Sequence, residues 1–160
     1  MRTLQYGISK PFLVSLAFRG VIMMGCDINS QWLQKEKIDY THTYKMGLYA
    51  LASGGIMSYG IKWFQPIFSK VSTLKQVGIS SFLELGLWSS TCLPILLIIS
   101  KPKPEELNKK VFDLTTMSAC WIPVTFMQMR YSFPIHKQLM IRNGVISISA
   151  MYTTYVIHKT

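Results

Sequence analysis

Residues 77–99 read VGISSFLELGLWSSTCLPILLII, a stretch in which Glu84 is the single formal charge. About twenty predominantly apolar residues are enough to cross the hydrocarbon core of a bilayer, whereas helices buried inside soluble domains are usually shorter. Serines and a glycine dilute the first part of the stretch, but residues 93–99 are almost entirely Leu and Ile. This stretch therefore predicts a transmembrane helix.

Further weakly charged blocks occur on both sides of this stretch, at residues 12–26, 46–61, 121–133 and 145–157. We expect Pro123, Pro134 and Gly144 to break the last part of the chain, residues 116–157, into one kinked span with an interfacial or re-entrant helix, or into two short spans. The pattern predicts a single all-α domain over residues 1–160. Its class is a polytopic membrane helix bundle with four transmembrane helices, or five if the kinked last block crosses twice.

Prolines and polar stretches suggest where the helices begin and end. Pro11 suits the first turn of a helix that should run to Leu33. A polar connector is expected over residues 34–44, and a second helix over residues 44–64, closed by Pro66. A third helix is expected over residues 74–99.

Two proline-containing segments follow. Pro94 lies near the end of the third helix, where a proline kinks or terminates a helix. Residues 101–113, which include Pro102 and Pro104, are expected to form the most soluble loop of the chain.

Composition and charge favour a membrane protein over a nucleic-acid-binding one. Only 15% of residues are charged, against roughly 25% in an average soluble domain. The net charge of +10 does not indicate nucleic-acid binding, which needs basic residues gathered on one face. The basic residues instead lie in every connector, where they would meet headgroups of anionic lipids such as cardiolipin. These lysines are Lys35, Lys37, Lys45, Lys62, Lys70, Lys75, Lys101, Lys103, Lys109 and Lys110.

Cysteine and histidine usage predicts neither a metal site nor a cofactor. The three cysteines fall in apolar blocks without CxxC spacing. The three histidines are scattered, with no i,i+4 pair and no carboxylate at ligand spacing. Since no nucleophile–base pair or phosphate-binding loop occurs either, we expect a non-enzymatic protein.

Polar residues inside apolar blocks are the candidate functional residues, because each unpaired charge at mid-depth in a membrane is expensive. They would line a pore or form ion pairs between helices. For the ion pairs, we expect Asp27 or Glu84 to meet Arg19 or Arg130, with Arg142 near an interface. The full candidate set is Arg19, Asp27, Gln31, Glu84, Arg130 and Arg142.

Small residues mark a helix-packing face. Ala50, Gly54 and Ser58 recur every four residues, with Gly47 one turn earlier. This spacing lets two helix backbones approach closely in a membrane. Gly20 begins a face of the first helix that also carries Asp27 and Gln31. The predicted packing residues are Gly20, Gly47, Ala50, Gly54 and Ser58.

The order of these residues resembles the Mpv-seventeen family, relatives of the twenty-two-kilodalton peroxisomal membrane protein. In that family a helix opens with Pro, has Gly nine residues later, and then Gly-Asp and Gln. A Trp-aromatic pair ends the second helix, a Lys precedes the third, and two prolines lie eleven residues apart. The matching residues here are Pro11, Gly20, Asp27, Gln31, Trp63, Phe64, Lys75, Pro123, Pro134, His136 and Tyr152.

The resemblance implies a four-helix protein of the mitochondrial inner membrane, or less often of peroxisomes, that forms a channel for small solutes or maintains the membrane. Polar positions of the family pattern are replaced here, because Ser80 and Ser81 stand where it has Asp-Gln. Because these polar positions are lost, the resemblance supports the fold and the membrane location more firmly than it supports transport. The alternative is therefore a non-catalytic accessory structural subunit of a larger membrane complex, such as a respiratory complex. A homo-oligomer is the assembly expected of a channel.

Overall fold

The structure is a computed structural model that describes residues 9–34, 37–131 and 133–158, and every regular element in these ranges is helical. The all-α class predicted from the sequence is therefore confirmed. In chain order the elements are α1 (Lys10–Leu33), α2 (Tyr40–Phe68), α3 (Thr73–Ser81), the π-helical η1 (Phe82–Cys92), α4 (Leu93–Ser100), α5 (Pro104–Ala119), α6 (Ile122–Arg130) and α7 (Ile135–His158).

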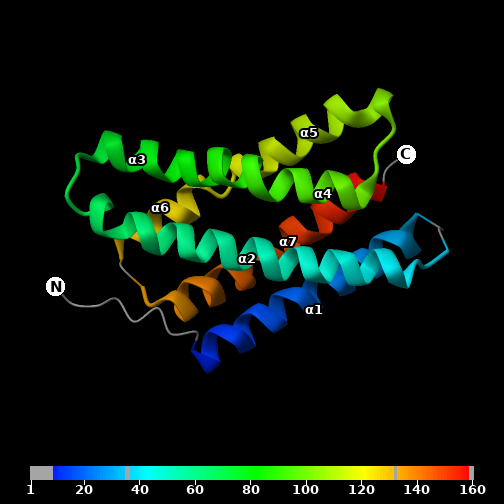
Figure 1. Cartoon of the computed structure of the whole chain (residues 1–160), viewed down its shortest axis with the longest axis horizontal. Helices are drawn as coiled ribbons and strands as arrows, with labels where there is room; N and C mark the ends of the chain where they lie inside the picture. Colours follow the sequence, from blue (N-terminus) through cyan, green and yellow to red (C-terminus); the bar gives the residue numbers. More distant parts are fainter. Residues whose placement is uncertain (1–8, 35–36, 132, 159–160) are drawn as a thin grey trace.

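The helices form an elongated bundle (Figure 1). Helix α1 packs against both α2 and α7, while η1 packs against α2 and α5. The α1–α2 connection and the C-terminal end of α7 lie at the same end of the bundle, on the right in Figure 1. Met46, Met57 and Leu83 are among the fully buried side chains of the core.

The first two helices begin at side-chain caps. Ser9 Oγ accepts from the backbone N–H of Phe12 at 3.4 Å at the start of α1. Asp39 caps α2 by accepting from the backbone N–H groups of Thr41 at 2.9 Å and His42 at 3.1 Å. This cap explains why α2 begins at Tyr40, earlier than predicted.

The expectation that Pro66 closes the second helix was wrong. Pro66 lies within the last turn of α2, which continues to Phe68. A proline removes one i→i−4 hydrogen bond of a helix, and α2 ends two residues after Pro66.

Helices α3, η1 and α4 form one continuous rod over Thr73–Ser100. Pro94 neither ends nor interrupts it. The backbone N–H of Leu93 bonds to the carbonyl of Trp88, five residues back. This wider π-type turn relieves the clash that a proline ring makes with the carbonyl four residues before it.

The loop predicted over residues 101–113 is largely helical, because α5 begins at Pro104. Proline suits the first helical position, and Glu105 and Glu106 in the first turn favour the positive end of the helix dipole. Gly144 also does not break its block, since it lies inside the continuous helix α7.

Two helical stretches are long and apolar enough to cross a membrane: Lys10–Leu33 with 24 residues and Thr73–Ser100 with 28 residues. At about 1.5 Å per residue, each exceeds the roughly 30 Å of a hydrocarbon core. The first and third predicted spans therefore meet this criterion. The other predicted spans, in the second helix and in the last part of the chain, stay a prediction.

Candidate functional site: two buried carboxylates

Glu84 lies near the middle of the bundle in a closed polar network. Its carboxylate forms an ion pair with Arg142 of α7 and accepts a hydrogen bond from Thr125 of α6. Arg142 Nε also donates to Gln128 Oε1 at 3.1 Å, and the guanidinium lies 5.2 Å from the ring centroid of Trp121. Glu84 and Arg142 are both buried, so the network joins η1, α6 and α7.

The ion-pair partners predicted from the sequence were wrong. Arg19 Nε donates to the Ala50 carbonyl at 3.1 Å, and Arg130 Nη1 contacts Gln76 Oε1 at 3.4 Å. Arg142, expected near an interface, is only 4% exposed. The chain turns back between α6 and α7, which brings Arg142 beside Thr125. The spacing of charges along the chain therefore could not predict that Arg142 is the partner of Glu84.

Arg19 is the second buried arginine of the core. Its Nη1 atom is buried without a hydrogen-bond partner in the described part of the chain. A cavity of about 40 Å³ borders this residue, Glu84 and Arg142. That volume holds one or two water molecules.

The small residues of α2 make room for the side chains of α1. A Cβ atom on Gly54 would lie 2.6 Å from Arg19 Cδ, and one on Gly47 would lie 2.7 Å from Met24 Cγ. The backbones also approach, since a Cβ atom on Gly20 would lie 3.5 Å from the Gly47 carbonyl oxygen. The five predicted packing residues, Gly20, Gly47, Ala50, Gly54 and Ser58, are all buried.

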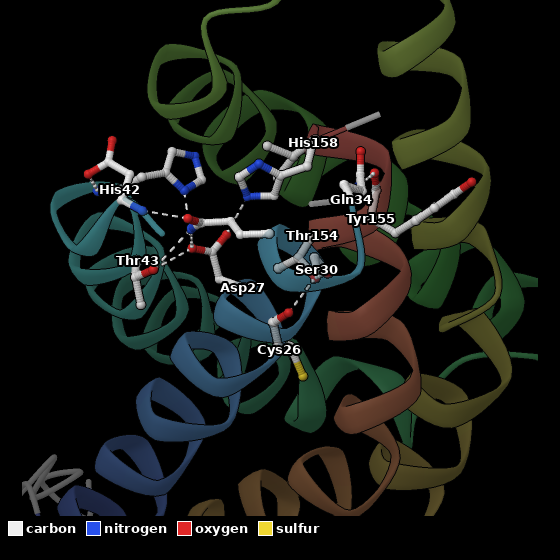
Figure 2. Close-up of polar contacts among 12 residues, drawn as sticks. Cys26, Asp27, Ser30, Gln34, His42, Thr43, Thr154, Tyr155 and His158 are labelled. Carbon is white, nitrogen blue, oxygen red and sulfur yellow. Dashed lines mark hydrogen bonds and ion pairs between the residues drawn. The ribbon is translucent and has the colours of Figure 1, made fainter. Parts of the chain in front are cut away.

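Asp27 forms a second polar cluster at the end of the bundle where α1, α2 and α7 meet (Figure 2). Its Oδ2 atom accepts from Gln31 Nε2 and Thr43 Oγ1, each at 2.7 Å. His42 Nδ1 lies 3.2 Å from the same oxygen, and His158 Nε2 lies 2.8 Å from Oδ1. The Asp27 side chain is fully buried, while the two histidine side chains are 15% and 11% exposed.

Gln31 positions His42 through the cap of α2. While its Nε2 atom donates to Asp27, its Oε1 atom accepts from the backbone N–H of Asp39 at 2.6 Å. Asp39 in turn caps the first turn of α2, which carries His42. A single amide thus fixes the last turns of α1 against the first turn of α2.

Contacts from α1 and α5 position His158, the last residue of α7. Ser30 and Thr154 join α1 to α7 through a hydroxyl–hydroxyl bond of 2.7 Å. Lys110 Nζ donates to the Ile157 carbonyl at 2.8 Å, a favourable contact for a cation at a helix C-terminus. Lys110 was grouped above with headgroup-facing lysines, but it is buried in this contact. Lys35 of the same group lies outside the described residues.

The Asp27 cluster contains residues that the sequence pattern did not associate. Asp27 and Gln31 were candidates, whereas both histidines were treated as isolated. His42 lies 15 residues from Asp27 in the chain and His158 lies 131 residues away. Only the packing of three helix ends brings these side chains together, so residue spacing carried no signal for them.

No family model matches the chain, and no curated protein or solved structure is significantly similar to it. The resemblance to the Mpv-seventeen family therefore rests on the residue pattern alone.

Proposed function

We propose that the chain is a non-catalytic integral protein of the mitochondrial inner membrane that serves as an accessory structural subunit of a larger membrane assembly. The observation that carries this proposal is a markedly apolar outer surface around a bundle whose central carboxylate, Glu84, is paired internally with Arg142. The core cavity beside Glu84 and Arg142 is about 40 Å³, the size of one or two water molecules.

The outer surface supports placement among lipids and partner helices. Leu74 is 83% exposed, Ile148 78% and Trp63 72%. Soluble monomers rarely expose extensive apolar patches, which usually mark membrane or protein contacts. An apolar groove of about 400 Å³ lies along α5, α6 and α7, and a second of about 620 Å³ lies between α1 and α7. Grooves of this kind accept lipid chains or a helix of a neighbouring subunit.

Exposed lysines lie at both ends of the bundle. Lys70 and Lys75 are near the α2–α3 turn, while Lys101 and Lys103 are at the α4–α5 turn at the opposite end of Figure 1. Lysines in such positions would contact anionic headgroups, including those of cardiolipin. The mitochondrial location itself rests on the family resemblance, and the peroxisomal membrane is its alternative.

A second candidate function is a channel for small solutes, and Arg19 favours it. Its unpartnered Nη1 atom borders the core cavity, whose lining includes two arginines, Arg19 and Arg142, and one carboxylate, Glu84. A surplus positive charge at mid-depth would select anionic solutes if the bundle opened.

Reconstitution distinguishes the two candidates. We expect purified chain in cardiolipin-containing vesicles to produce no flux of small anions, in the wild type and in Arg19→Met alike. Flux in the wild type that is lost in Arg19→Met, together with a free monomer or homo-oligomer in mild detergent, would overturn the accessory-subunit proposal in favour of the channel.

A further inference from the structure

We propose that Asp27, His42 and His158 bind one divalent transition-metal ion, with Zn²⁺ the best match to the ligand set. One oxygen and two imidazole nitrogens converge from α1, α2 and α7, and these ligand atoms all lie within 4.8 Å of one another. Two neutral imidazoles and a carboxylate form a common ligand set for Zn²⁺.

The distances fit a four-coordinate site after small side-chain movements. Zn–N and Zn–O bonds of about 2.0–2.2 Å place neighbouring tetrahedral ligands about 3.3 Å apart. His42 Nδ1 and Asp27 Oδ2 are already 3.2 Å apart. The two imidazole centroids are 4.8 Å apart, so small rotations of the rings bring both nitrogens onto one ion.

The hydrogen bonds around Asp27 also favour an ion. Oδ2 accepts short hydrogen bonds from Gln31 and Thr43, which hold the carboxylate in place. The 3.2 Å contact from His42 is a third, longer contact to this same oxygen. With a cation bound, Nδ1 of a neutral His42 supplies a lone pair to the metal, while Gln31 and Thr43 orient the carboxylate from behind.

The position of the cluster gives the ion access and a structural role. Both histidine side chains are partly exposed, so water can reach the ion and supply the fourth ligand. His158 is the last residue of α7, and His42 lies in the first turn of α2. A bound ion would therefore fasten the end of α7 to the α1–α2 hairpin.

Co²⁺ titration of the purified full chain, prepared without a polyhistidine tag, tests this site. We expect one equivalent of Co²⁺ to give visible d–d absorption bands of a four-coordinate site, and Zn²⁺ to displace it. His42→Ala, His158→Ala and Asp27→Asn should each weaken binding by about 100-fold or more, and Thr43→Val by about 10–100-fold. His136→Ala, which removes the third histidine of the chain, should bind as the wild type does.

Two results would overturn the proposal: no Co²⁺ bands from the wild type, or unchanged bands in His42→Ala or His158→Ala. Zn X-ray absorption of the wild type decides the ligand set without any variant. Two imidazoles and no sulfur are expected, whereas a Zn–S distance of about 2.3 Å would place the metal on a cysteine instead. Because these tests use the purified chain alone, a failure leaves the proposed membrane role standing.

Discussion

The two buried carboxylates, Asp27 and Glu84, are stabilised in different ways. Glu84 in the middle of the bundle meets one guanidinium, that of Arg142, and one hydroxyl. Within the described residues, Asp27 at the end of the bundle contacts no guanidinium or ammonium, and its carboxylate is held by Gln31, Thr43 and two histidines. The central carboxylate thus has one counter-ion and one hydroxyl donor, whereas the terminal carboxylate contacts four side chains.

This difference predicts unequal sensitivity to substitution. Removing one partner of a buried ion pair leaves an uncompensated charge in an apolar interior. Removing one of several hydrogen-bond donors leaves the others in place.

The largest loss is expected from Arg142→Met, which leaves Glu84 buried without its counter-ion. We expect the free energy of unfolding to fall by about 3–5 kcal/mol. The measurement is denaturant unfolding in detergent micelles, followed by far-UV circular dichroism. A loss below about 1 kcal/mol would mean that the pair is not buried as described. Glu106→Ala is the control and should lose less, because Glu106 is 27% exposed and Lys110 keeps its hydrogen bond to the Ile157 carbonyl.

The double variant Glu84→Leu/Arg142→Met separates charge from packing. Since it removes both charges, it should recover much of the stability lost in Arg142→Met. Equal losses in the single and double variants would show that shape, rather than charge, makes the central network sensitive.

A smaller loss is expected from His158→Ala in metal-free protein. It removes one donor to Asp27 and leaves Gln31, Thr43 and His42 in place, so we expect about 1.5–3 kcal/mol by the same unfolding measurement. A loss equal to that of Arg142→Met would contradict the distributed stabilisation of Asp27.

A steric substitution next to Arg19 should lower the free energy of unfolding by as much as His158→Ala does, or by less. In Gly54→Ala the new methyl group would lie 2.6 Å from Arg19 Cδ, and such overpacking costs about 1–3 kcal/mol. Gly55→Ala is the matched control, because nothing lies within 4 Å of its Cβ position. It should be neutral or stabilising by up to about 1 kcal/mol. Equal effects at the two positions would exclude close packing at Gly54.

The smallest effect is expected from Thr154→Val, which preserves shape but removes the hydroxyl bond to Ser30 between α1 and α7. A loss of about 0.5–1.5 kcal/mol is typical of one buried hydrogen bond. Thermal unfolding of the same preparations measures it. A loss above about 3 kcal/mol would make this link more important than either carboxylate cluster.

The sequence predicted the elements whose signals are local. The helical class, the extent of α1 and the small-residue face follow from apolar length, a proline in the first turn and four-residue spacing. Proline rules were less successful at Pro66, Pro94 and Pro104. Pro66 lies near a helix end, Pro94 follows a π-type turn, and Pro104 stands in a first turn. Each setting accommodates a proline, and the proline residue alone does not reveal its setting.

The candidate site was predictable only in part. Asp27 and Glu84 were identified because a carboxylate inside an apolar block is unusual. Their partners were missed, because Arg142 lies 58 residues from Glu84 and His158 lies 131 residues from Asp27. Long-range pairs of this kind follow from how helices pack, and local sequence periodicity contains no information about them.

The size of the native particle is the most direct test of the proposed accessory role. Mitochondrial membranes would be solubilised in a mild detergent and separated by native electrophoresis, and the chain detected by antibody. We predict that the 18.3 kDa chain migrates with a large membrane complex and stays there on re-electrophoresis. Migration as a free monomer or small homo-oligomer would contradict the account.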